Sequence, residues 1–140
     1  MVIHNKLEIK KGKDVFVSFN TLLKPALVKI GELLPYSDLI AIGNGGSEGD
    51  LTQEKLESWR ETLPLVTDSF NFDPLNGTLF LTKKLVLDET NQTPLEIVEV
   101  GLTGESGKNP SVANRFVVNG GEPIYRDAGE EMSLTITIFV

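Results

Sequence analysis

Few residues of this chain have side chains that could do chemistry. His4 is the only histidine, and the sequence contains no cysteine. A Ser-His-Asp mechanism would have to use His4, and no Gly-x-Ser-x-Gly sequence supplies a nucleophile elbow. A zinc site would need His4 with carboxylates alone, and thiol chemistry is excluded. We therefore expect no catalytic residue, no metal site and no cofactor, and we expect that the protein is not an enzyme.

A glycine-rich segment at residues 43–50 (GNGGSEGD) follows a short apolar run, which is where a phosphate-binding loop would lie. It lacks the third glycine of the dinucleotide fingerprint, and no Gly-Lys-Ser/Thr follows. Glu48 and Asp50 would also place negative charge against the phosphates. A calcium site from Asn44, Glu48 and Asp50 stays open, although the spacing does not match an Asp-x-Asp-x-Asp-Gly loop. We interpret the segment as a flexible connection exposed at one end of a sheet.

The N-terminal third of the chain combines strand and helix patterns. Residues 1–17 alternate apolar and charged side chains around a turn at residues 11–13, which predicts a terminal strand or arm. Apolar residues then recur at helical spacing, which predicts an amphipathic helix over residues 20–34. The apolar residues 39–42 predict a short buried strand. Asp50 or Thr52 could cap a second, short helix that runs through Arg60.

The rest of the sequence is typical of strands and turns. A hairpin is predicted between residues 66–72 and 78–87, because Asp73-Pro74-Leu75-Asn76-Gly77 is a turn sequence. Further strands are expected at residues 95–103, 113–118, 123–127 and 132–140, the last with strict alternation of apolar and polar residues. The predicted fold is mainly β, a single domain over residues 1–140. Its core at residues 36–140 is an antiparallel β-sandwich, jelly-roll-like, beside the N-terminal helix.

Composition and charge narrow the range of partners. The 140 residues are 40% hydrophobic and 24% charged, as in a globular protein, and no apolar run approaches the roughly 18 residues of a membrane span. The N-terminus has no signal-peptide core. The net charge of -7 argues against a nucleic-acid partner. Residues 1–30 carry six lysines and two acids, a net +4, so the remainder carries -11. The basic segment could lie on an acidic neighbouring subunit, or its lysines could protect a strand edge.

Five segments, taken in order, resemble small structural proteins of tailed bacteriophages and prophages that are associated with the tail or baseplate. They are residues 36–45 (YSDLIAIGNG), 56–60 (LESWR), 98–102 (VEVGL), 112–118 (VANRFVV) and 132–140 (MSLTITIFV). The resemblance implies a mainly β particle component that oligomerises and has no catalytic residues. The first 35 residues depart from the pattern, which leaves the mode of attachment open.

The resemblance also implies structural roles for six residues. Gly43 and Gly45 would end the first sheet strand, and backbone freedom would be their role. Glu57 and Arg60 would lie in an acidic and arginine-containing segment, with Arg60 in a partly buried ion pair with a carboxylate. Two further positions fall in the central strand motif, Glu99 and Gly101.

Three classes of function follow for testing. The leading hypothesis is a non-catalytic structural protein that oligomerises through strand edges and the N-terminal arm, with other virion or tail proteins as partners. Its location would be the virion, or the bacterial cytoplasm during assembly, with no membrane partner. The alternative is a sandwich module that binds a glycan or receptor, which an exposed patch with Trp59 or Tyr125 would favour. The third is a hydrolase built on scattered carboxylates, which would need a deep cleft with two facing acids.

Overall fold

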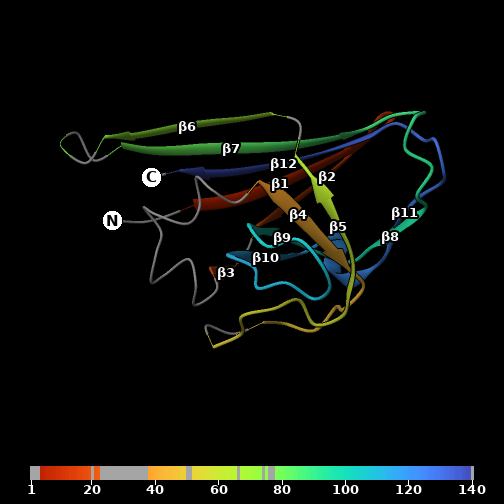
Figure 1. The fold of residues 1–140 in the computed structure, drawn as a ribbon, viewed down its shortest axis with the longest axis horizontal. Coiled ribbons are helices and arrows are strands. Elements are labelled where there is room, and N and C mark those ends of the chain that lie inside the picture. The colour runs from red at the N-terminus through yellow and green to blue at the C-terminus, as the bar shows by residue number, and fades with distance from the viewer. Residues whose placement is uncertain are drawn as a thin grey trace.

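The computed structural model in Figure 1 describes residues 4–19, 21–22, 38–49, 52–65, 67–73, 75 and 78–139. These residues form three antiparallel sheets, so the predicted mainly β fold is confirmed. The strands are β1 (His4–Lys11), β2 (Asp14–Phe19), β3 (Thr21–Leu22), β4 (Leu39–Gly43), β5 (Trp59–Pro64), β6 (Thr67–Asp73), β7 (Thr78–Leu87), β8 (Leu95–Ile97), β9 (Glu99–Thr103), β10 (Asn114–Val117), β11 (Ile124–Arg126) and β12 (Met132–Phe139). A short 3-10 turn, η2, spans Asn119–Gly121.

The first sheet has the order β2-β1-β12-β7-β6 and is built around the C-terminal strand. Along β12 every second side chain is buried, as the sequence alternation predicted. The predicted hairpin is also confirmed, since β6 pairs with β7 from Thr67 opposite Lys84 to Asp73 opposite Thr78. Lys83 interrupts the row of leucines in the sequence, yet it lies on the same face as Leu81 and Leu85 and is fully buried.

The N-terminal strand lies inside the first sheet. β1 pairs with β12 on one side and with β2 on the other, and His4 lies opposite Phe139. The predicted turn is present between Lys11 and Asp14, where Gly12 has a φ of +59° that favours glycine. The N-terminal segment from His4 onward is therefore a strand of the sheet and does not extend away from it as a free arm.

The second sheet, in the order β3-β10-β9-β4-β5, shares one hydrophobic core with the first. Figure 1 shows its shorter strands beside the long strands of the first sheet. Both sheets and the small third sheet, β11-β8, contribute buried side chains to this core. Among them are Leu7, Ile9, Ile40, Ile42, Leu85, Ile97, Leu102, Phe116, Ile124, Leu134 and Ile136. The chain passes from the first sheet to the second between β2 and β3.

The structure does not bear out the two predicted helices in the residues that it describes. Thr21 and Leu22, inside the helix predicted over residues 20–34, form β3 and pair with Arg115 and Asn114; residues 20 and 23–34 lie outside the described residues. The second predicted helix is wrong over residues 52–60. There the chain is irregular until β5 begins at Trp59. No helix in the described ranges is long and apolar enough to cross a membrane.

The apolar run at residues 95–103, predicted as one strand, divides between two sheets. β8 pairs with β11 in the third sheet, whereas β9 pairs with β4 and β10 in the second. Val98 lies between them, and its amide donates to the Gly43 carbonyl at 3.0 Å. The division brings Glu99 to the first position of β9, against the end of β4.

Candidate functional site

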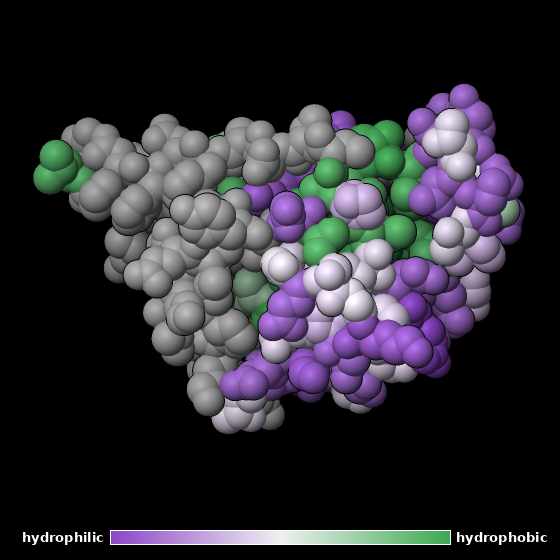
Figure 2. Space-filling view, in the orientation of Figure 1, coloured by the Kyte–Doolittle hydropathy of each residue, from purple (hydrophilic) through white to green (hydrophobic). Residues whose placement is uncertain are grey.

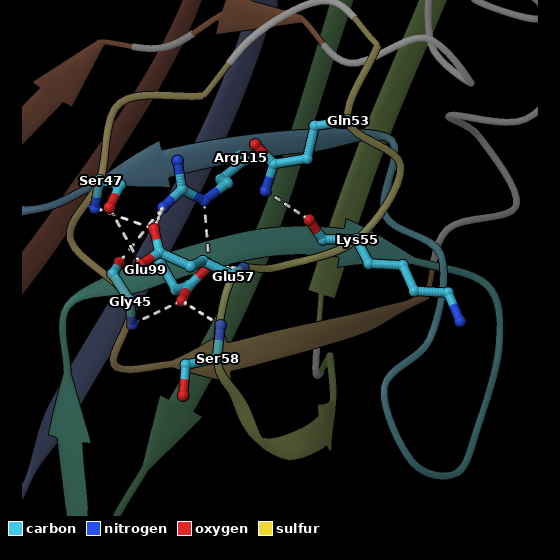
Figure 3. Close-up of polar contacts among 8 residues, drawn as sticks. All are labelled: Gly45, Ser47, Gln53, Lys55, Glu57, Ser58, Glu99 and Arg115. Carbon is cyan, nitrogen blue, oxygen red and sulfur yellow. Dashed lines mark hydrogen bonds and ion pairs between the residues drawn. The ribbon is translucent and has the colours of Figure 1, made fainter.

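A buried carboxylate lies at the centre of the most polar part of the second sheet. Glu99 is fully buried, and its register places it opposite Gly43 of β4 and Val117 of β10. Its Oε1 accepts hydrogen bonds from the Glu57 amide at 2.6 Å and from Arg115 Nε at 3.0 Å. Its Oε2 accepts from the Gly45 amide at 2.5 Å and from the Ser58 amide at 2.9 Å. Four donors of the chain itself therefore surround this carboxylate (Figure 3).

Arg115 completes this arrangement from β10. Its side chain is only 3% exposed and forms ion pairs of 3.0 Å with Glu99 and 3.4 Å with Glu57. It also donates to the Gly45 carbonyl at 3.2 Å. Glu57 in turn accepts from the Ser47 amide at 2.9 Å and from the Ser47 hydroxyl at 3.0 Å. We name this set the Glu99–Arg115 cluster; its members are Gly45, Ser47, Glu57, Ser58, Glu99 and Arg115.

The chemistry open to the Glu99–Arg115 cluster is limited by its own hydrogen bonds. A catalytic carboxylate needs an oxygen that can reach substrate, but both oxygens of Glu99 already accept two bonds each. Buried charges that are paired and hydrogen-bonded in this way fix the arrangement of the chain around them. The cluster ties both ends of the segment 44–58 to β9 and β10.

Four of the six residues predicted to have structural roles come together here: Gly43, Gly45, Glu57 and Glu99. Among the described residues, Arg60 does not form the predicted buried ion pair: it is exposed and donates to the carbonyl of Trp59 at 3.4 Å. Arg115 makes the pair instead. The signal for Arg115 was present in the sequence as one arginine within the apolar run 112–118.

Gly43, Gly45 and Gly101 lie where neighbouring atoms leave no room for a Cβ, and their backbone conformations do not require glycine. None of them has a positive φ. A Cβ on Gly43 would overlap the Ser58 carbonyl oxygen, and one on Gly45 would overlap the Glu99 carboxylate. Gly101, farther along β9, is packed in the same way against the backbone of Asn114. The predicted role of conformational freedom is therefore wrong at these positions.

The glycine-rich segment is held by carboxylates on its amides. The amides of Gly45 and Ser47 donate to Glu99 and Glu57, so these N–H groups are not available to a phosphate. In the described part of the chain, no three His, Cys, Asp or Glu residues gather as metal ligands. Glu48 is exposed, and Asp50 of the open calcium hypothesis lies outside the described residues. The segment predicted as a flexible connection is bound at Gly45 by Glu99 of β9 and at Ser47 by Glu57.

A second buried arginine, which the sequence analysis missed, organises the third sheet. Arg126 is 1% exposed and donates to the carbonyls of Glu130 at 2.8 Å, Thr93 at 2.7 Å, Asp88 at 3.0 Å and Asn91 at 2.9 Å. It also donates to the Asn91 side chain at 3.2 Å. These five bonds hold the segment 88–93 against the turn after β11, and no substrate group is needed to satisfy the guanidinium.

Asp88 belongs to the same segment. Its carboxylate accepts the Thr90 hydroxyl at 2.6 Å and the Thr90 amide at 2.8 Å. These hydrogen bonds to Thr90, with a smaller contribution from the charge of Arg126, lower the pKa of Asp88 below its ordinary value of 3.8. The lowered pKa of Asp88 therefore follows from the hydrogen bonds of the turn that begins at this residue.

The two aromatic side chains singled out in the sequence differ in exposure. Trp59 is half-buried, packs with Leu56, Ala41 and Val112, and donates its indole N–H to Thr62 at 2.9 Å. Trp59 is therefore packed against side chains of its own chain and offers less of its ring to a ligand than an exposed residue would. Tyr125 of β11 is 59% exposed.

Two shallow hollows are lined by residues that the structure describes. One, of about 330 Å³, lies at the end of the first sheet between Lys10, Asp88 and Glu131. The other, of about 280 Å³, lies beside Asn44, Arg60 and Glu96. Both mix charges of either sign and are open, so neither has the enclosed, mainly apolar lining typical of small-molecule sites.

The outer face of the first sheet carries exposed apolar side chains. On β2 every second residue points outward, and Val15, Val17 and Phe19 are 54%, 48% and 71% exposed. Phe80 and Val86 of β7 add to this face. Figure 2 shows one side of the molecule, where apolar residues gather right of centre in the upper part of the view, with hydrophilic residues along its lower margin and right-hand end. Exposed apolar groups in a row are a feature of interaction surfaces.

Comparison of the chain with protein families, with curated proteins and with solved structures gave no match.

Proposed function

We propose that this chain is a non-catalytic structural protein that acts by assembling, in the manner of a tail-associated virion component of a phage or prophage. In this proposal its two larger sheets act as a jelly-roll-like sandwich whose surfaces contact other copies and partner proteins. The observation that carries the proposal is the apolar row Val15, Val17 and Phe19 on β2, a strand at the edge of its sheet. Exposed apolar side chains in a row on one face of a sheet are a feature of surfaces that contact another chain.

The buried charges support the same proposal. Glu99, Arg115 and Arg126 are the kinds of residue that perform chemistry or bind anions when they are accessible. Here each is nearly or fully buried, and each is committed to hydrogen bonds with loops of its own chain. The polar interactions therefore stabilise shape, and the outward-facing apolar residues are left for contacts.

Light-scattering mass measured across a dilution series tests this function. We expect a mass above the 15.4 kDa of one chain at high concentration, falling toward 15.4 kDa on dilution. A strictly monomeric chain at high concentration, which also brings down no partner from the lysate of its source, would contradict it.

A second candidate function is recognition of a glycan or another surface receptor, and the exposure of Tyr125 favours it. An aromatic ring that is 59% exposed offers an apolar face for stacking. A glycan-array screen of the protein, with Tyr125→Ala as the control, is the test. Hits that disappear in Tyr125→Ala would support recognition, and the absence of any hit would remove it.

A further inference from the structure

We propose that Asn119 is a site of spontaneous covalent modification, where the side-chain amide is lost and the residue becomes aspartate or isoaspartate. This inference is independent of the proposed assembly function. It begins from the sequence Asn119-Gly120-Gly121, which forms the turn η2 between β10 and β11. Glycine after asparagine offers little steric hindrance to this reaction, because it has no Cβ beside the backbone nitrogen that reacts.

The reaction needs only the chain and water. The backbone nitrogen of Gly120 loses its proton to solvent and attacks Cγ, the side-chain carbonyl carbon of Asn119. The new bond joins Gly120 N to Asn119 Cγ, the bond from Cγ to Nδ2 breaks, and Nδ2 takes up a proton from water and leaves as ammonia. Water then opens the five-membered ring at one of its two carbonyls, which gives aspartate or isoaspartate. Because the reacting groups belong to adjacent residues, the attack is intramolecular.

The turn η2 holds both reacting residues at the surface. Asn119 has a φ of +48°, Gly120 has a φ of +65° and a ψ of 20°, and both residues are exposed. Two successive residues in the left-handed region form the tip of a type I′ turn. The Gly121 amide closes this turn by donating to the Val118 carbonyl at 2.8 Å, and the Glu122 amide donates to the Asn119 carbonyl at 3.1 Å. The hydrogen bonds of the turn therefore use the amides that follow Gly120.

Neither reacting group is held by a neighbour. In the part of the chain that the structure describes, the Gly120 amide and the Asn119 side chain have no hydrogen-bond partner. A Cβ placed on Gly120 would meet no atom within 4 Å beyond the adjacent residues, so there is open space around the reacting nitrogen. Exposed turns with few contacts open at low free-energy cost. The amide and the side chain can therefore reach the geometry of attack without disturbing the core.

A second pair of asparagine and glycine, Asn44-Gly45, provides the contrast. Gly45 is buried, and its amide donates to the Glu99 carboxylate at 2.5 Å. The Asn44 amide donates to the Ser58 carbonyl at 2.9 Å. A nitrogen held in this way cannot turn toward the preceding side chain unless the Glu99–Arg115 cluster opens, which costs free energy. The folded chain should therefore react at Asn119 and be protected at Asn44.

Asn109 shows that an exposed, left-handed asparagine is not sufficient. It is exposed and has a φ of +48°, as Asn119 does. The residue that follows it is Pro110, whose nitrogen carries no hydrogen and cannot act as the attacking amide. The site is therefore defined by two features together, an exposed turn and a following glycine whose amide is not engaged.

Peptide mass mapping of the wild-type protein after incubation at mildly alkaline pH measures the reaction at each site. Trypsin places Asn119 in peptide 116–126 and Asn44 in peptide 30–55, and each peptide contains a single asparagine. The product has the mass of an NH2-to-OH exchange, and its two isomers separate by chromatography. In the folded protein we expect Asn119 to convert at least about tenfold faster than Asn44. In urea that unfolds the chain, we expect the two rates to agree within about threefold.

Two alanine variants of the same turn complete the test. Gly120→Ala places a Cβ beside the reacting nitrogen and should slow the conversion of Asn119 by more than about tenfold. Gly121→Ala is the matched control, because it also adds a Cβ at a positive φ, +90°, but leaves the Gly120 nitrogen unhindered; it should not slow the conversion. Equal rates at Asn119 and Asn44 in the folded protein, an Asn119 that stays unmodified, or equal slowing by the two variants would overturn the inference.

Discussion

At Glu99, four hydrogen-bond donors meet a single carboxylate that has no contact with water. Burying Glu99 and Arg115 requires that both charged groups lose their hydration. In exchange, Glu99 fixes the position of segment 44–58, because three of its donors are backbone amides at the two ends of that segment. Removing one charge from such a pair leaves the other buried without compensation. A single substitution at Glu99 should therefore lower the free energy of unfolding more than a substitution at an exposed member of the cluster.

Replacing the carboxylate with an amide measures this cost. Glu99→Gln leaves the buried Arg115 with only its longer pair to Glu57, and it replaces one acceptor oxygen with an NH2 group that faces other donors. We therefore expect a loss of about 3–5 kcal/mol in the free energy of unfolding. Glu57→Gln is the matched control, because the Glu57 side chain is 42% exposed and its pair with Arg115 is longer. There we expect a loss below about 1 kcal/mol. Urea denaturation provides both values, and equal losses would contradict the role given to Glu99.

Gly45 and its neighbour Gly46 allow a test of the space requirement. Gly45→Ala places a Cβ against Glu99 and Glu57, and we expect it to destabilise the fold by about 1–3 kcal/mol. Gly46→Ala meets its nearest side-chain atom at an ordinary 3.4 Å, without a positive φ, and should change stability by less than about 0.5 kcal/mol. The measurement is again urea denaturation. A similar effect at the two positions would show that contact with the cluster is not what selects glycine.

At the scale of elements, the third sheet depends on Arg126 for its connection to the segment after β7. Lysine in its place has one charged group that cannot reach four carbonyls in different directions. We expect Arg126→Lys to lower the free energy of unfolding by about 2–4 kcal/mol, because buried carbonyls lose their donors. Arg60→Lys, at an exposed arginine, should change it by less than about 0.5 kcal/mol. Thermal unfolding of the two variants side by side would contradict the account if their midpoints shifted equally.

The turn at Asp88 gives a prediction on pH. Because the pKa of Asp88 is lowered in the folded chain, its ionised form stabilises the fold above 3.8, and this contribution is lost as the pH falls from 3.8 through the folded pKa. Thr90→Ala removes the hydroxyl bond, which is the largest cause of the shift. NMR titration of the Asp88 carboxyl should then show its pKa moved up toward 3.8. An unchanged titration in Thr90→Ala would mean that the hydroxyl is not the cause.

Individual elements also show which parts of the fold can be predicted from the sequence. The alternation of β12 and the turn residues between β6 and β7 act within a few positions, and both elements form where they were predicted. The helix predicted through Arg60 fails because Leu56 and Trp59, three residues apart, imitate helical spacing. They pack instead on Ala41 and Val112, from distant parts of the chain.

The candidate site was predictable to a similar extent. Gly43, Gly45, Glu57 and Glu99 were singled out in the sequence and do come together. Which arginine pairs with a carboxylate there, Arg60 as predicted or Arg115 as observed, depends on which strands are neighbours. β10 lies next to β9, which brings Arg115 to the carboxylate, and no local pattern encodes that neighbourhood. The same holds for Arg126, whose acceptors lie 33 to 38 residues away along the chain, apart from Glu130.

At the scale of the whole molecule, charge and apolar surface are both unevenly distributed. The net +4 of residues 1–30 and the -11 of the remainder place a basic segment in an otherwise acidic protein. In the first sheet this segment supplies β1 and β2, so its lysines flank the apolar column of β2. A basic segment in an otherwise acidic chain can approach the acidic surface of another copy, which fits a protein that is proposed to associate despite a net charge of -7.

Hydrogen-deuterium exchange of the wild-type chain, at concentrations well above and well below the onset of self-association, tests this claim most directly. Contact through the apolar row of β2 would shield the amides of this strand from solvent only in the assembled form. We predict slower exchange at high concentration in a peptide covering residues 14–19, and the same rate at both concentrations in a peptide covering β5. Exchange at residues 14–19 that does not depend on concentration would contradict assembly through β2.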